Sequence, residues 1–145
     1  MVTFEIFVQR FDKLLPFLKE KAPEIALKHE TEIIQLSNKQ LLQGSNIWDK
    51  VMQTGYSTNY GKKRRKAGLQ TQFVDLKFTG KYQKSKKLVV DAQENGIDII
   101  SDADYEGYLR TNFPDHVGLN KKNADTISEK IVKELADETK KYLVE

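Results

Sequence analysis

The spacing of apolar residues at the two ends of this 145-residue chain constrains its fold most. Near the C-terminus, apolar side chains recur at intervals of three, four and seven residues, which is the period of one face of an α-helix. These residues are Ala124, Ile127, Ile131, Leu135 and Tyr142. Asn120 stands before this stripe as a candidate N-cap. The pattern predicts a long amphipathic helix at the C-terminal end.

The N-terminal part of the chain shows the same helical period. Apolar residues recur every three or four positions, at Phe4, Phe7, Phe11, Leu14 and Leu18. Thr3 is placed to cap this first helix, and Pro16 is expected to kink or restart it, because proline lacks the N–H group that a helix interior needs. A second helix is predicted over residues 24–43, after a break at Ala22-Pro23.

Residues 44–69 show no periodicity and are expected to form one long loop. Small and polar residues alternate with tyrosines there, and five consecutive basic residues come near its end: Lys62, Lys63, Arg64, Arg65 and Lys66. Such a length without secondary structure is uncommon inside a compact domain and is usually functional or ordered by a partner. The basic loop is therefore a candidate interaction segment.

Alternation of apolar and polar residues predicts strands after this loop. Residues 74–79 read as a half-buried strand, with Val74, Leu76 and Phe78 on one face. Residues 88–101 read as a hairpin about Asn95-Gly96, a pair that suits a type I′ turn. The sequence therefore predicts three antiparallel strands.

The hairpin also has a predicted register. A two-residue loop pairs Glu94 with Ile97 and Ala92 with Ile99. That pairing places the apolar side chains together on one face, at Leu88, Val90, Ala92, Ile97 and Ile99. The agreement between turn and apolar face supports the hairpin.

The order of these segments indicates an α+β fold, with N-terminal helices and a C-terminal helix packed on a small antiparallel β-sheet. A short helix over residues 104–113, ended by Pro114, precedes the C-terminal one. The length fits a single domain over residues 1–145. Its expected parts are helices in 1–43, the basic loop in 44–69, strands in 70–101, and the short and C-terminal helices in 102–145.

Composition excludes several classes of protein. Without cysteine, the chain has neither disulfides nor thiolate chemistry. Charges interrupt the apolar pattern of the first 15 residues, and no stretch approaches the roughly 18 apolar residues that span a bilayer, so a soluble protein without membrane contact is expected. The net charge is only +3, so any electrostatic interaction must be local.

Residue types that carry catalysis are sparse. The only histidines are His29, within a predicted helix, and His116, in a predicted turn, and no serine stands in a nucleophile elbow. The glycines lack the spacing of a phosphate-binding loop. We therefore expect no enzymatic activity, no cofactor and no small-molecule substrate.

One acidic run resembles the first half of a calcium-binding loop: Asp102, Asp104, Glu106 and Gly107. The twelfth position of such a loop is a glutamate, but here it is Phe113, which excludes a complete EF-hand. The expected role of these carboxylates is to cap the short helix that follows them, with a weaker metal site as the alternative.

Basic residues form two clusters on either side of the first predicted strand. They are Lys62, Lys63, Arg64, Arg65 and Lys66 in the first cluster, and Lys81, Lys84, Lys86 and Lys87 in the second. If the clusters lie close together, they attract phosphate groups, and Tyr56, Tyr60 and Tyr82 are available to stack on bases.

Two other interpretations of the basic clusters remain open. Lysines in a solvated loop and along a sheet edge also prevent unwanted strand pairing. Alternatively, the basic residues of one subunit meet the acidic residues of the next in a head-to-tail ring. The acidic set consists of Asp98, Asp102, Asp104 and Glu106.

The order of features from residue 24 to residue 143 resembles small virion proteins of tailed phages, in particular neck and tail-completion proteins. The segments that carry the resemblance are Gln40-Leu41-Leu42-Gln43-Gly44, then Val74-Asp75-Leu76-Lys77-Phe78 running into Thr79-Gly80 and Tyr82-x-x-Ser85, and finally Val117-Gly118-Leu119-Asn120 before the last helix.

This resemblance implies a non-enzymatic head–tail connector or tail-completion protein of the virion. It implies a ring between portal and tail, with other portal, neck or tail proteins as partners. The lysines would serve assembly or line a channel for packaged DNA. The alternative function, from a different class, is a small DNA- or RNA-binding protein that uses the basic loop.

Overall fold

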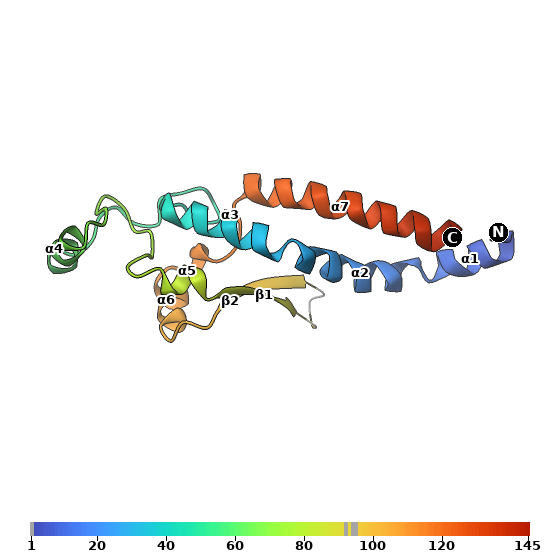
Figure 1. The fold of residues 1–145 in the computed structure, drawn as a ribbon, viewed down its shortest axis with the longest axis horizontal. Helices are drawn as coiled ribbons and strands as arrows, with labels where there is room; N and C mark the ends of the chain where they lie inside the picture. Colours follow the sequence, from blue (N-terminus) through green and yellow to red (C-terminus); the bar gives the residue numbers. More distant parts are fainter. Residues whose placement is uncertain (1, 92, 94–95) are drawn as a thin grey trace.

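A computed structural model describes residues 2–91, 93 and 96–145 and has the predicted α+β fold (Figure 1). The helices are α1 (Phe4–Asp12), α2 (Leu14–Lys28), α3 (Glu30–Leu42), α4 (Thr58–Lys66), α5 (Lys81–Lys84), α6 (Glu106–Asn112), the 3₁₀ helix η1 (Pro114–His116) and α7 (Lys121–Val144). The strands β1 (Lys86–Asp91) and β2 (Gly96–Ser101) form an antiparallel sheet.

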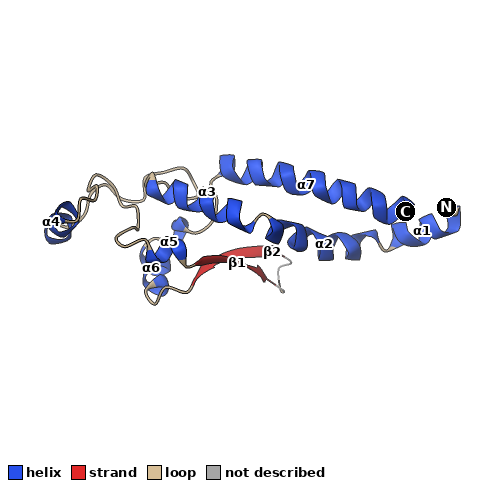
Figure 2. Ribbon diagram, viewed as in Figure 1, coloured by secondary structure: helices blue, strands red, loops and turns tan. Residues whose placement is uncertain are grey.

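The molecule is elongated, because α1, α2 and α3 follow one another along its length. The long helix α7 runs back beside them, so that the two termini lie at the same end (Figure 1). The hairpin of β1 and β2 lies on the other side of α2 and α3 (Figure 2). Helix α4 lies at the end remote from the termini, beyond both α7 and the hairpin.

Two apolar clusters hold these layers together. The first joins α3, both strands and α7 through four buried side chains: Ile33, Leu88, Ile99 and Ile127. The second joins the end of α3 to α5 and α6 through Leu41, Tyr82, Ala103 and Leu109. Burial of each large apolar side chain contributes about 1.5–3 kcal/mol. Because α3 contributes Ile33 to the first cluster and Leu41 to the second, both clusters depend on this helix.

The N-terminal helices begin as predicted but divide at a different residue. Thr3 caps α1 by accepting a hydrogen bond from the N–H of Ile6, and Pro16 lies in the first turn of α2, after the break at Lys13. The predicted break at Ala22-Pro23 is wrong, because Pro23 lies inside α2. The chain instead breaks at His29, so residues 24–43 do not form one helix.

Packing explains why α2 continues past its proline. A proline in a helix interior costs about 3 kcal/mol, since one backbone hydrogen bond is lost. The next turn contains Ile25 and Ala26, which are the buried residues of α2. Their burial offsets the loss, and tertiary contacts outweigh the local preference.

The hairpin has the predicted apolar face but a different register. Leu88 pairs with Ile99, and Val90 pairs with Ile97. The predicted pairing of Ala92 with Ile99 is therefore wrong by four residues, an even shift that leaves every side chain on its predicted face. Ala92, Glu94 and Asn95 lie outside the described residues, whereas Gly96 of the predicted turn pair begins β2 and pairs with Asp91. The register places Leu88 and Ile99 together against the first apolar cluster.

The predicted strand over residues 74–79 is absent from the described structure, so the region 70–101 contains only β1 and β2, with α5 before them. A single bridge joins Thr54 to Phe73, and Leu76 has a φ of 54°. In the predicted strand, alternation places Asp75 on the face opposite Val74 and Leu76, but its side chain is buried and bonded. A left-handed backbone at Leu76 interrupts the extended conformation that a strand requires.

The prediction that residues 44–69 form a loop is also wrong, because α4 occupies Thr58–Lys66. The last two helices are confirmed as α6 and α7, and the side chain of Asn120 caps α7 by accepting from the N–H of Asn123 at 3.0 Å. Within the part of the chain that the structure describes, no helix combines the length and apolarity needed to cross a bilayer.

Replacing Ile127 with alanine is expected to lower the free energy of unfolding by about 2–5 kcal/mol, because it removes a buried side chain from the cluster that joins α3, the hairpin and α7. Denaturant titration followed by circular dichroism measures this loss. The control is Val90→Ala at the exposed end of β1, with an expected change below about 1 kcal/mol. Equal losses of unfolding free energy in Ile127→Ala and Val90→Ala would contradict the placement of Ile127 in the buried core.

Candidate functional site

The basic segment folds into a small lobe, residues 53–78, that we call the cationic head. Two chain segments form its base: the N–H of Gly55 donates to the carbonyl of Gln72, and the N–H of Val74 donates to that of Gln53. Helix α4 lies at the outer end (Figure 1). The head is thus an ordered projection and not a free arm.

Its base packs closely on the end of α3. Gly44 has a φ of +75°, and a Cβ at this position would lie 2.4 Å from Cδ2 of Phe73. Only glycine fits both the left-handed backbone and this close approach. The contact fixes the head against the body at the point where α3 ends.

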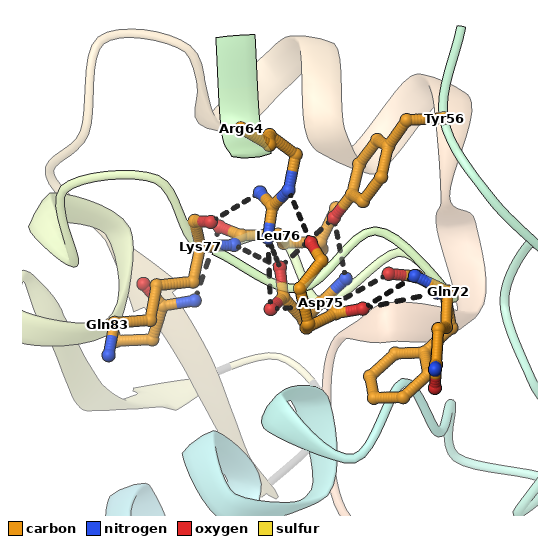
Figure 3. Close-up of polar contacts among 9 residues, drawn as sticks. Tyr56, Arg64, Gln72, Asp75, Leu76, Lys77 and Gln83 are labelled. Atoms are coloured by element: carbon orange, nitrogen blue, oxygen red, sulfur yellow. Dashed lines mark hydrogen bonds and ion pairs between the residues drawn. The ribbon is translucent and has the colours of Figure 1, made fainter. Parts of the chain in front are cut away.

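A buried ion pair forms the centre of the head (Figure 3). Arg64 is 1% exposed, and its Nη2 lies 3.1 and 3.2 Å from the two carboxylate oxygens of Asp75. Nε of Arg64 donates to the carbonyl of Gln70, and Nη1 donates to that of Lys77. The guanidinium therefore binds three residues of the segment 70–77 that follows α4.

The carboxylate of Asp75 is equally well bonded. It accepts hydrogen bonds from the Tyr56 hydroxyl at 3.0 Å, from Nε2 of Gln70 at 2.9 Å and from the N–H of Lys77 at 3.0 Å. Burial raises the pKa of Tyr56 to about 12, so this hydroxyl stays protonated and donates. The pair is fully satisfied, as a buried charge must be.

These contacts explain why α4 forms without an apolar stripe. A nine-residue helix with glycine and asparagine in it is unstable alone. Its buried residues are Gly61 and Arg64, and the Tyr60 ring, beside them and 37% exposed, packs against Tyr56 and Phe78. Arg64 was predicted as a binding residue, but it is a structural residue. The helical spacing of Tyr60 and Arg64 is the signal in the sequence that marks the inward face of α4.

The other basic residues of α4 remain on the surface: Lys62, Lys63, Arg65 and Lys66. Within the described residues, none of these four forms an ion pair, although Nζ of Lys63 lies 5.0 Å from the centre of the Phe78 ring. The only carboxylate of the head is Asp75, which Arg64 neutralises. The structure thus brings four free cations together on one helix.

The second predicted cluster does not join the first. Helix α5 and strand β1 lie against the body, whereas α4 lies at the outer end of the head (Figure 2). Lys81 pairs with Asp104 at 2.9 Å, and Lys87 pairs with Asp102 at 3.0 Å. Lys84 is exposed. The two predicted sets of opposite charge therefore meet largely within one subunit.

Lys86 is the second predicted binding residue that proves to be structural. It is 7% exposed, and its Nζ donates to the Ser37 hydroxyl at 3.0 Å and lies 5.1 Å from the centre of the Tyr82 ring. Burial lowers the pKa of Lys86 to about 8, because the charged amine loses its hydration. Its position in β1 points it into the body.

The acidic run also serves internal contacts. Asp102 and Asp104 bind the lysines of the second cluster, while Glu106 binds Arg110 at 2.6 Å. The prediction that these carboxylates cap α6 is wrong for the N-cap position, which Tyr105 occupies without a side-chain hydrogen bond. Across the described residues, no group of three acidic or histidine side chains converges as a metal site.

Both histidines have structural partners. Nε2 of His29 lies 2.7 Å from Glu134 and links the junction of α2 and α3 to α7. His116 is fully buried; its Nδ1 donates to the carbonyl of Phe113, and its Nε2 accepts from the Tyr82 hydroxyl. Burial lowers the pKa of His116, which keeps the ring neutral.

A second surface lies at the opposite end of the molecule, on what we call the apolar arm: α1, the start of α2 and the C-terminal half of α7. Its side chains line a shallow groove, among them Phe7, Leu18, Val132, Leu135, Ala136 and Leu143. Helix α1 has no buried residue, and Phe4 is 80% exposed. Of the apolar stripe predicted from the sequence, Phe4 and Phe11 are exposed, and the other three residues are half-buried.

Comparisons with protein-family models, with curated proteins and with solved structures found no match to this chain. The resemblance to phage neck and tail proteins stays a prediction. The chain presents two surfaces that can bind other molecules, the cationic head and the apolar arm.

Replacing Arg64 with alanine is expected to destabilise the cationic head by about 3–5 kcal/mol, because it leaves the buried Asp75 without a counter-charge. Amide hydrogen exchange, resolved by residue, should show lost protection in α4 and retained protection in α7. The control is Arg65→Ala, at the adjacent exposed position, which should leave α4 protected. Similar exchange in both variants would show that the ion pair does not hold the head.

The burial of Lys86 predicts a rise in stability with pH. The pKa of this amine is about 8 in the folded protein and 10.5 when unfolded, so the unfolded chain binds more protons between these values. The free energy of unfolding, relative to the variant Lys86→Met, should therefore rise by about 3 kcal/mol from pH 8 to pH 10.5. Denaturant titrations across this range measure it.

The exposed Lys84→Met variant is the control for this titration. It should follow the unmodified protein at every pH. If the free energies of unfolding of the unmodified protein and Lys86→Met differed by the same amount at every pH, this would contradict the burial of an amine without a counter-charge.

Proposed function

We propose that this chain is a non-enzymatic structural subunit of a tailed-phage virion, in the neck or tail, as a head–tail connector or tail-completion protein. The observation that supports an assembly role is the apolar arm. Helix α1 buries none of its nine residues, although Phe4, Phe11 and Leu15 project from it and the adjoining turn of α2. An apolar surface of this kind typically marks a site of protein contact.

The arm has few contacts that hold it in an isolated subunit. Phe17 stacks on Tyr142 at 4.1 Å between ring centres, and Arg10 donates to the Tyr142 carbonyl at 2.9 Å. These contacts fix the arm beside α7 but leave its outer face open. A neighbouring subunit that covers this face would stabilise α1 by burying its phenylalanines.

A ring requires the apolar arm of one subunit to contact a different surface of the next subunit. Such contacts are heterologous, and they close into a ring when the rotation between subunits permits. Among the described residues, the buried charged groups and the buried histidine have internal partners: Arg64, Asp75, Lys86 and His116. They support the fold, as expected of a structural subunit.

The assembly role predicts that the full chain forms oligomers through the apolar arm. Sedimentation velocity over a concentration series should show them, and the double variant Phe11→Glu, Val132→Glu should weaken association at least about tenfold, or 1.4 kcal/mol. Both side chains are exposed, so the monomer fold should survive. The control is Tyr108→Glu in α6, which is equally exposed but lies outside the arm.

A persistent monomer at high concentration would contradict the assembly role. Equal association of the unmodified protein, the double arm variant and Tyr108→Glu would also contradict it. The virion assignment has its own test in the adjacent genes. Portal, capsid or tail genes beside this one support it, whereas a metabolic operon contradicts it.

A further inference from the structure

We propose that the outer face of α4 binds the phosphate backbone of double-stranded nucleic acid, without reading its sequence. The binding residues are Lys62, Lys63, Arg65 and Lys66. The second basic cluster takes no part. This surface lies at the other end of the molecule from the apolar arm, so the inference does not rest on the proposed assembly role.

The helical period of α4 orients these residues. Gly61 and Arg64 are its buried positions and define the inward face. Lys62 and Lys66 are four residues apart and share the opposite face, and Lys63 and Arg65 flank them. The bonds of Arg64 to Asp75, Gln70 and Lys77 hold this orientation. The four cations therefore project outward from a fixed helix.

The arrangement is unfavourable without an anionic partner. Like charges four residues apart destabilise a helix, and no exposed carboxylate lies in residues 53–78 to offset them. The cationic head carries six Lys and Arg against one Asp, a net charge of +5. Because the whole chain carries +3, the remaining residues carry −2. Positive charge is thus concentrated at the end where α4 lies, and it attracts polyanions.

The second cluster lacks this free charge. Lys81 and Lys87 are paired with Asp104 and Asp102, and Lys86 is buried against Ser37. A phosphate that bound there would have to displace a carboxylate. Lys84 is the one member of this cluster that is exposed and outside the ion pairs of the described residues, so the four unpaired cations of α4 form the larger group.

The position of the tyrosines favours a duplex over a single strand. Proteins that bind single strands stack bases on exposed aromatic rings. Here the Tyr56 ring covers the Arg64 guanidinium at 4.3 Å, Tyr60 packs on Tyr56 and Phe78, and Tyr82 is buried. Tyr60 is 37% exposed, but its ring is held by these contacts, so the outer face of α4 presents mainly charge. A duplex carries one charge per roughly 1.7 Å of its axis, a denser array than a single strand or a folded protein surface presents.

The test measures binding of the full chain to a short labelled DNA duplex of random sequence by fluorescence anisotropy. Four phosphate contacts predict a slope of about −3.6 for log affinity against log salt concentration, or a loss of about 150-fold between 50 and 200 mM salt. The variant Lys62→Gln, Lys63→Gln, Arg65→Gln, Lys66→Gln should abolish this slope, with the circular dichroism spectrum retained.

The matched control removes the same charge from the helical body: Lys19→Gln, Lys28→Gln, Lys39→Gln, Lys133→Gln. All four lysines are exposed, and this variant should keep the slope of the unmodified protein. Equal losses in the two variants would show that net charge alone controls binding, and would overturn the assignment to α4.

Competition identifies the partner. Unlabelled duplex should displace the probe more effectively than single-stranded DNA or polyglutamate at equal charge. Stronger competition by the single strand would overturn the duplex assignment, and stronger competition by polyglutamate would overturn it in favour of an acidic protein as partner. The arm variant Phe11→Glu, Val132→Glu should show the same dependence of DNA affinity on salt as the unmodified protein. Loss of association with an unchanged salt dependence would separate DNA binding from the assembly role.

Discussion

The cluster of Ile33, Leu88, Ile99 and Ile127 is the contact on which the arrangement of the molecule depends. It packs α3 between the hairpin on one side and α7 on the other. Each strand of the hairpin has six residues, and the hairpin lies along α2 and α3 (Figure 2). The first helix extends beyond it with an open apolar face, and the cationic head extends beyond it at the other end. A short sheet under a long helical pair thus produces two separate surfaces.

The cationic head has a different kind of centre. An isolated lobe of about 25 residues cannot bury enough apolar surface to order itself. Here one arginine binds a carboxylate and two backbone carbonyls, so a single side chain fixes α4, the segment after it and the residues before α5. A buried ion pair adds little net stability in general, but it defines one geometry. That geometry turns the remaining basic residues outward.

The two surfaces suit a protein that joins other molecules. The apolar arm offers area for a protein neighbour, while the cationic head offers unpaired charge on a rigid support. Charged residues near the hairpin are already paired with one another within the chain. The difference between the two ends follows from which charges the fold neutralises and which it leaves free.

The sequence by itself determined the helices at both ends, the caps at Thr3 and Asn120, and the apolar face of the hairpin, because these depend on local period and on side chains that bond nearby backbone. Only the tertiary structure decided the register of the strands, the break at His29 and which basic residues are buried.

The basic residues show the physical reason for this division. Arg64 and Arg65 are adjacent members of one run of charges, yet Arg65 is exposed, whereas Arg64 is buried because Asp75, eleven residues away, pairs with it. Lys86 is buried because its strand faces Ser37 of α3. Contacts between distant residues separate a structural cation from a free one, and no local pattern contains them.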